Sequence, residues 1–385
     1  MLIAASAAAL MATASACSVT ESKDTSSSGS AGAITVESSA EACELTAGEA
    51  PSGNVAFKVK NTGSEVTEFY LYAEDGMRIV GEIENVGPGL SRDLVVRAAP
   101  GTYVTSCRPG MTGKGIRSEF TVTDSGEDTE ITGVDQATID AATSQYAAYV
   151  KDQASQLVDQ TEQFITLYKA GNDDEARALF PHARGYWERI ETVAESFGDL
   201  DPKMDLREAD LEEGQKWTGW HRIEKDLWSP ASGYKQLSTP QRARFADDLM
   251  ANTRILDQRL PTLEYTVDQI GNGSKGLLDE VASNKITGEE DIWSHTDLYD
   301  FQANVDGARV AYEGLKPLLE VKDPALSKQI ESAFDALQTL LEKYKVGEDD
   351  FVFYDKVTEP QRRELSDAVN TLAEPLSKMT GAITL

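Results

Sequence analysis

Residues 140–171 read DAATSQYAAYVKDQASQLVDQTEQFITLYKAG, and this stretch decides how the chain is divided. Its apolar residues recur at steps of three and four, through Tyr146, Phe164 and Tyr168, and Gly171 follows as a C-cap. This period is typical of an amphipathic α-helix, because residues three or four apart share one face of a helix. The stretch therefore predicts one long helix at the start of a helical half.

The sequence keeps this helical period nearly to its end. Further amphipathic segments are 175–197, 239–271, 295–320, 323–345 and 359–379. Strand-like runs are scarce throughout this half. We therefore predict that residues 136–385 form an antiparallel helical bundle.

Before the long helix, the pattern is that of β-strands. Runs rich in β-branched and aromatic residues, such as NVAFKVK (54–60), TEFYLY (67–72) and TYVTSC (102–107), alternate with turns that contain Asn, Asp, Gly or Pro. Such spacing predicts a β-sandwich or barrel of roughly seven strands over residues 33–124. The acidic, turn-rich residues 125–135 predict a linker. The expected fold class is thus a β domain followed by a helical bundle.

The first residues have the features of an export signal. Residues 1–16, MLIAASAAALMATASA, carry no charge, end in small residues and lead into Cys17. This arrangement predicts a signal that is removed, and it resembles a bacterial lipobox, in which the Cys17 thiol would be lipidated. The Ser- and Gly-rich residues 17–32 predict a flexible tether. We therefore expect an exported protein with a lipid anchor, in the periplasm or on the outer face of the cytoplasmic membrane.

The net charge of the chain indicates which classes of partner it can bind. Lys and Arg number 36 against 65 Asp and Glu, for a formal net charge of −29. That field repels phosphate backbones, so nucleic-acid binding is not expected. A carboxylate surplus suits cations that take oxygen ligands, although it also serves solubility alone.

Two pairs of residues at helical spacing are candidate metal ligands. His221 lies in WTGWHRIEKDLW (217–228), and Glu224 follows three positions later on the same helix face. Helical bundles use such pairs of His and Glu to bind metal ions, although an ordinary ion pair gives the same pattern. Glu188 and Glu191 form a second pair among apolar residues, where carboxylates are costly unless they are paired or ligating.

Other acidic residues nearby in the sequence would complete a mixed site. Asp205 and either Glu289 or Glu290 would add oxygen ligands. Such a set suits Fe, Zn, Mn or Cu. The alternative is a helix surface on which these carboxylates pair with Arg184, Arg189 and Arg207.

Three blocks of the helical half resemble the imelysin-like domain of the EfeO and EfeM family of iron-uptake proteins. They are YWERIETVAESFGDLDPKMDLRE (186–208), WTGWHRIEKDLW (217–228) and KITGEEDIWSHTDLYDFQANVDGA (285–308). The resemblance implies iron as the cargo, with copper or zinc as alternatives. It also implies that the following residues line the metal site: Glu188, Glu191, Asp205, His221, Glu224 and Glu289, with Glu290 equally able to take the place of Glu289.

The β half is similar to the cupredoxin-like domain of EfeO. The resemblance lies in residues 41–72, 81–94 and 99–107. It implies candidate ligands for copper or iron, namely Cys43, Cys107, Glu68 and Glu82 or Glu84. The alternative for the two cysteines is a disulfide, which is common in exported β domains. A blue-copper centre is not expected, because this half contains no His.

Three hypotheses for the function follow. The first is an extracytoplasmic metal-binding component of an iron-uptake system, for which the resemblance implies an EfeU-type permease and an EfeB-type haem peroxidase as partners. The second is a metallopeptidase, a class in which this family is also placed; it is disfavoured because His221 has no second His at helical spacing. The third is a lipoprotein that binds a polysaccharide or a protein, with the five tryptophans stacking on sugars.

Overall fold

The computed structural model describes residues 33–74, 76, 79–111, 113–126, 134–211, 214–228, 233–283 and 285–384. The expected export signal (1–16), Cys17 and the expected tether (17–32) lie outside the described residues. Residues 127–133 of the expected linker lie outside them as well. The described strands end at Thr123, and the first helix begins at Val134.

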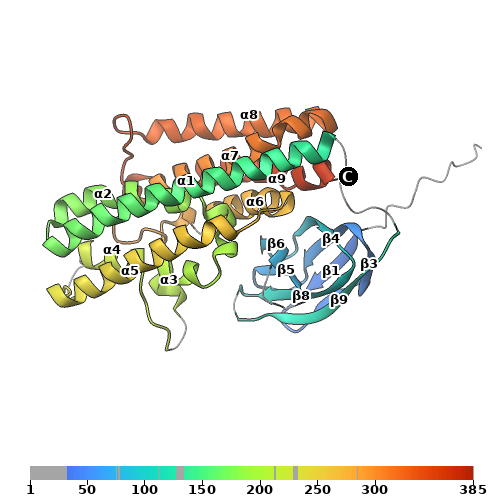
Figure 1. Ribbon diagram of the computed structural model, residues 1–385, viewed down its shortest axis with the longest axis horizontal. Coiled ribbons are helices and arrows are strands. Elements are labelled where there is room, and N and C mark those ends of the chain that lie inside the picture. Colours follow the sequence, from blue (N-terminus) through green and yellow to red (C-terminus); the bar gives the residue numbers. More distant parts are fainter. Residues whose placement is uncertain are drawn as a thin grey trace, which may run out of the picture. The chain divides into compact units, whose positions relative to one another are not determined.

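The N-terminal part of the described chain is a sandwich of two sheets (Figure 1). One sheet has the order β2-β1-β4-β7, with β2 Cys43–Leu45, β1 Ile34–Ser38, β4 Gly53–Asn61 and β7 Ser91–Ala98. The other has the order β3-β9-β8-β5-β6, with β3 Glu49–Pro51, β9 Ile116–Thr123, β8 Gly101–Pro109, β5 Thr67–Ala73 and β6 Ile79–Val86. The predicted sandwich is confirmed, with nine strands among the described residues. Two of these, β2 and β3, have only three residues each, too few to show a period.

Alternating side chains of the strands form the core of the sandwich. Phe57 and Val59 of β4 and Phe69 and Leu71 of β5 are fully buried. The rings of Phe57 and Phe69 have centroids 5.2 Å apart, so the two sheets meet through aromatic contact. In β4 the buried residues alternate with more exposed ones, whereas in β5 the residues that alternate with Phe69 and Leu71 are buried as well.

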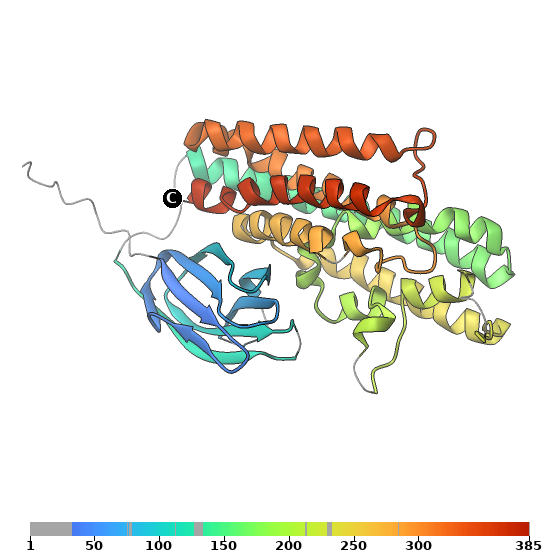
Figure 2. The same cartoon turned by 180° about the vertical axis from the view of Figure 1, so that it is seen from behind.

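The remainder of the described chain is helical (Figures 1 and 2). The longer helices are α1 Val134–Ala170, α2 Asp173–Glu188, α5 Thr239–Arg259, α6 Val267–Ser283, α7 Asp297–Lys322, α8 Pro324–Leu341 and α9 Glu359–Leu376. The shorter ones are α3 Asp201–Met204, α4 Trp220–Trp228 and α10 Met379–Thr384, with a 3-10 segment at Glu191–Leu200. The predicted long helix is confirmed as α1, which ends before Gly171 at a φ of 78°.

The helices form a bundle in which α7 packs against α1, α2 and α8, while α9 packs against α6 and α8. Only Gly171 and Asn172 connect α1 to α2, and only Asp323 separates α7 from α8. Connections this short reverse the chain direction and make the neighbouring helices antiparallel. Among the described residues, no helix is both long enough and apolar enough to cross a bilayer.

Two glycines bring separate segments of the bundle close together. Gly219 has a φ of 87°, and a Cβ there would lie 2.1 Å from the carbonyl oxygen of Met204. Gly307 of α7 lets that helix approach the carbonyl oxygen of Arg189, which a Cβ would meet at 2.3 Å. The start of α4 is thereby held against the end of α3, and α7 against the end of α2. These contacts position the cluster described next.

Candidate metal centre

A cluster of buried charged side chains lies inside the helical domain. Its members come from the helices α2, α4 and α7 and from three connecting segments. These segments directly follow α2, directly follow α3 and directly precede α7. They are Arg184, Glu188, Glu191, Asp205, His221, Glu224, Lys285, Glu290, Asp291, Asp300 and Asn304. All of them except Glu191 are buried, and the Glu191 side chain is only 13% exposed. Buried charges at this density must compensate one another or bind ions.

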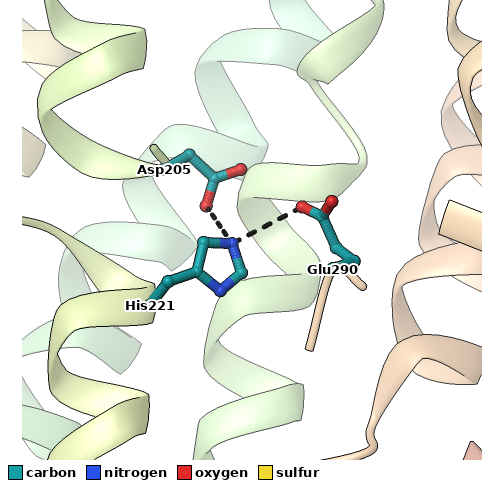
Figure 3. A group of neighbouring side chains, drawn as sticks. All are labelled: Asp205, His221 and Glu290. Atoms are coloured by element: carbon teal, nitrogen blue, oxygen red, sulfur yellow. Dashed lines mark ion pairs between the residues drawn. The ribbon is translucent and has the colours of Figure 1, made fainter. Parts of the chain in front are cut away.

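His221 lies at the centre of the cluster, with one ring nitrogen facing two carboxylates (Figure 3). Its Nε2 is 3.5 Å from Oδ1 of Asp205 and 3.5 Å from Oε1 of Glu290. Two ligands of a tetrahedral ion at bond lengths near 2.1 Å lie about 3.4 Å apart. Both distances from Nε2 are therefore close to the spacing that one shared ion requires, and the three donor atoms all lie within 4.8 Å of one another. All three residues are buried, and Nε2 makes no hydrogen bond among the described residues.

Glu224 contacts the opposite ring nitrogen. Its Oε2 is 3.0 Å from Nδ1 of His221. Its Oε1 accepts hydrogen bonds from the backbone N–H groups of Trp293, at 3.0 Å, and Ser294, at 2.8 Å. The structure thus brings Glu224 into the cluster. There its contact restrains the imidazole, as carboxylates beside metal-binding histidines do. Glu224 also forms a group of possible ligands with His221 and Asp291, so the prediction of Glu224 as a ligand stays a prediction.

Asp205 and Glu290 are each held by other side chains. Oδ2 of Asp205 accepts a hydrogen bond from Nε1 of Trp187 at 2.8 Å, and its Oδ1 accepts one from Arg184. Oε1 of Glu290 accepts one from Nη2 of Arg184 at 2.7 Å. The carboxylates are therefore oriented before any ion is present.

Glu188 and Glu191 form a neighbouring group with Asp205. Nζ of Lys285 donates to Glu188 at 2.8 Å and to Glu191 at 2.7 Å, and Nδ2 of Asn304 donates to both at 2.9 Å. Ligand atoms of the two glutamates and of Asp205 lie within 4.8 Å of one another. Asp205 thus links this carboxylate group to the one that contains His221.

The structure separates the two candidates Glu289 and Glu290, between which the sequence did not decide. The Glu289 side chain is 49% exposed, and the charged group paired with it is Arg207 at 3.9 Å. The Glu290 side chain is 4% exposed and belongs to the cluster. The two residues follow a turn, where neighbouring side chains point in different directions, so helical spacing did not apply.

The charges around His221 set its protonation and that of Glu290. Burial and Arg184 lower the pKa of His221, but Glu224 and Glu290 beside the ring raise it overall, to about 10. Burial raises the pKa of Glu290, whereas the positive charges of Lys285, His221 and Arg184 hold it well below its usual range. The metal-free cluster therefore has an imidazolium facing an ionised carboxylate.

Other carboxyl groups of the cluster retain protons instead. Burial and Glu188 raise the pKa of Glu191 well above its usual range. Burial and Glu224 raise the pKa of Asp291 to about 7. Burial and Asp291 likewise raise that of Asp300. An entering cation would replace these protons, because ligands must be deprotonated to bind metal.

Several members of the cluster were not predicted from the sequence. Asp291, Asp300, Lys285 and Asn304 all lie in or beside the third block that resembles the imelysin-like domain. Their polar character gave no sign that they would be buried. Arg184 was expected as a surface partner of the carboxylates, but it is fully buried among them.

A cavity of about 310 Å³ borders the cluster. Glu191, Asp205 and Glu290 line it, together with the carboxylates of Asp201 and Glu280. Burial and Asp205 raise the pKa of Asp201 to about 7. The predicted ligands Glu191 and Asp205 thus face the same cavity, and the acidic residues that line it attract cations.

The predicted cysteine ligands of the β domain are corrected by the structure. Cys43 of β2 and Cys107 of β8 form a disulfide between the two sheets, so neither sulfur is the thiolate that a metal would bind. Glu68 is buried and paired with Nη1 of Arg108 at 3.0 Å. Neither Glu68 nor Glu82 belongs to any group of three candidate ligands among the described residues. The side chain of Glu84 lies outside the described ones.

Comparison with known proteins gives two domain matches. The family described as imelysin matches residues 142–379, and the cupredoxin-like domain matches residues 2–122. An "Efem/EfeO family lipoprotein" of Staphylococcus haemolyticus is 47% identical over 250 residues, which cover 64% of this chain and 85% of that protein. One from Staphylococcus aureus (strain MRSA252) is 43% identical over 247 residues, or 63% of this chain and 85% of that protein.

One solved structure is also similar in part. It is the crystal structure of a putative iron-regulated protein A precursor from Parabacteroides distasonis. The TM-score is 0.46 at 15% sequence identity, covering 68% of this chain and 96% of that one.

Proposed function

This chain belongs to the imelysin family and to its EfeM/EfeO group, and from that premise we propose that it is an extracytoplasmic component of an iron-uptake system. In this proposal it captures iron and passes it to a membrane permease. The observation that carries the proposal is the buried group of Asp205, His221 and Glu290, whose donor atoms all lie within 4.8 Å of one another. One nitrogen and several carboxylate oxygens suit iron, with zinc and copper as competitors.

In this proposal the residues of the cluster have different roles in metal binding. Asp205, His221 and Glu290 would hold the ion, because their donor atoms converge and the two carboxylates also line the cavity. Glu224 would keep Nε2 of His221 directed at the ion by occupying Nδ1. Glu188 and Glu191 supply a second group of oxygens that shares Asp205, and they would receive the ion on its way in or out.

The cellular setting is part of the same proposal. The Staphylococcus relatives are named as lipoproteins, which supports an exported chain anchored to the membrane through Cys17. An EfeU-type permease would receive the iron, and an EfeB-type haem peroxidase would act beside it. Both partners rest on the family resemblance of the sequence.

Metal titration tests the proposal. Fe(II) under anaerobic conditions, Fe(III), Cu(II) and Zn(II) would be titrated into the wild type and into His221→Ala and Glu290→Gln variants. Glu289→Gln is the matched control, because it removes the adjacent carboxylate, which lies outside the cluster. We expect tight iron binding that His221→Ala and Glu290→Gln abolish and Glu289→Gln retains. Binding no tighter than to an unrelated acidic protein would overturn the proposal.

A further inference from the structure

Arg184 occupies the middle of the carboxylate cluster. Its side chain is fully buried, and it pairs with five carboxylates from four separate segments of the chain. They are Glu188 at 2.6 Å, Asp205, Glu290 at 2.7 Å, Asp291 at 3.7 Å and Asp300 at 3.5 Å. A guanidinium stays charged at every physiological pH, so this positive charge is permanent.

The oxygens that Arg184 contacts are the ones that a metal ion would use. Oδ1 of Asp205 and Oε1 of Glu290 each lie 3.5 Å from Nε2 of His221. The same two atoms accept the hydrogen bonds from Nη1 and Nη2 of Arg184. The fork of the guanidinium therefore bridges the two ligand oxygens on one side while the imidazole faces them on another.

We propose that Arg184 is a resident counter-cation that sets the metal affinity of this site. In the metal-free protein it holds the two ligand oxygens in position. After the ion binds it keeps those hydrogen bonds, so that ion and guanidinium share the same oxygens. The inference rests on the proposed function, since it concerns the ion bound at that site.

Sharing of this kind weakens ion binding in two ways. A carboxylate oxygen that already accepts a hydrogen bond from a charged N–H group is a poorer metal ligand. The positive guanidinium also repels a cation bound to the same oxygen atoms, and the low-dielectric interior screens this repulsion little. A carrier that must release its ion needs a limited affinity. A group of carboxylates without a nearby positive charge would bind the ion too tightly to release it.

Removing the positive charge of Arg184 should strengthen metal binding, although the ligand carboxylates then lose the hydrogen bonds from Arg184. Asp205 would still accept the hydrogen bond from Trp187 through Oδ2. Glu290 would still have Nζ of Lys285 at 3.9 Å from Oε1. The loss of repulsion therefore outweighs the loss of positioning.

The test compares Zn²⁺ and anaerobic Fe²⁺ binding to the full chain with Arg184→Gln, Arg184→Lys and a control. Arg177→Met is the control, because Arg177 lies on the same helix but bonds to Asp174 and to the carbonyl oxygen of Leu227. Affinity is measured by competition with a chelator, and the release rate by chelator capture. The melting temperature is recorded with and without the ion.

We expect Arg184→Gln to bind the ion at least tenfold more tightly, to release it more slowly and to melt at a lower temperature only when the ion is absent. Arg184→Lys retains the charge and should stay within a few-fold of the wild type, as should Arg177→Met. Unchanged or weaker binding by a folded Arg184→Gln variant would overturn the inference. An equal decrease of the melting temperature with and without the ion would also overturn the inference, because it would mean that Arg184 only stabilises the fold.

A second variant decides the question if Arg184→Gln does not fold without the ion. Lys285→Gln removes another buried cation of the cluster, which donates to Glu188 and Glu191. It should also tighten binding, by a smaller factor, and weaker binding would contradict the inference. If the wild type itself binds no ion, the proposed function fails; if it binds but neither variant binds more tightly, only this inference fails.

Discussion

Glu224 and His221 form a fixed pair in which Oε2 of the carboxylate lies 3.0 Å from Nδ1 of the imidazole. The other carboxylate oxygen accepts two backbone N–H groups, so the carboxylate cannot turn away without breaking three contacts. In the proposed site, the His-x-x-Glu spacing places one ligand, His221, beside the residue that orients it.

Weakening this pair should lower the metal affinity without unfolding the protein. In Glu224→Gln the side chain keeps its shape but loses the charge that stabilises the oriented imidazole. We expect metal affinity to fall about 10- to 100-fold, the usual cost of losing such a partner. Chelator competition measures it, with melting temperature as the check on folding. An affinity equal to that of the wild type would show that Glu224 does not orient the ligand.

The metal-free protein should lose stability as the pH rises from 6.5 to about 10. The pKa of His221 is raised in the folded state from 6.5 to about 10, so the native protein binds an extra proton in that window. Its stabilising contribution is complete below pH 6.5 and is lost as the pH approaches 10, because stability falls wherever the folded state binds more protons.

Melting temperatures in a chelator at several values of pH check this expectation, with His221→Gln as the control. The variant should show a shallower decline over the same window. Metal affinity should rise with pH there, because the ion must displace the proton. A decline equally steep in the wild type and in His221→Gln would contradict the assignment of that proton to His221.

Gly219 should tolerate no side chain. In Gly219→Ala the new Cβ would lie 2.1 Å from the carbonyl oxygen of Met204, at a φ of 87°. We expect a loss of about 1–3 kcal/mol in the free energy of unfolding from the backbone strain alone, with a further loss from the clash. Metal binding should weaken too, because this contact sets α4 against Asp205.

Gly214→Ala is the matched control for that substitution. Gly214 has a similar φ of 84°, but a Cβ there would have nothing within 4 Å. It should lose stability from strain only and keep its metal affinity. Urea unfolding and metal titration on both variants separate the two effects, and equal losses would argue against the close contact at Gly219.

The disulfide should stabilise the β domain without affecting the metal centre. Replacing Cys43 and Cys107 together by Ser should cost about 2–4 kcal/mol in the free energy of unfolding of that domain. Metal stoichiometry should not change, since the ligands lie in the helical domain. A reduction by one ion per chain would instead restore the prediction that these cysteines bind metal.

The fold was predictable where the sequence has a long period. Helix α1 shows its three- and four-residue steps over many turns, and the strands around Phe57 and Phe69 lie in runs of β-branched and aromatic residues between turns. The short strands β2 and β3 could not be predicted, because three residues contain no repeat. Their places depend on pairing with β1 and β9, which is tertiary information.

The candidate site was predictable in part for a similar reason. Helical spacing linked His221 to Glu224 and Glu188 to Glu191, and Asp205 was added as a nearby acidic residue before the family resemblance supported the same set. Neither could separate Glu289 from Glu290, because the choice depends on the direction of a turn. Arg184 was expected on a helix surface and Lys285 was not singled out, since only the folded chain shows that the carboxylates surround them.

The central claim is that one ion binds between Asp205, His221 and Glu290. Anomalous diffraction at the iron edge, from crystals grown anaerobically with Fe²⁺, tests it most directly. The account predicts a single strong peak about 2.0–2.3 Å from Nε2 of His221, Oδ1 of Asp205 and Oε1 of Glu290. Iron found only on exposed carboxylates, with Nε2 of His221 unligated, would contradict it.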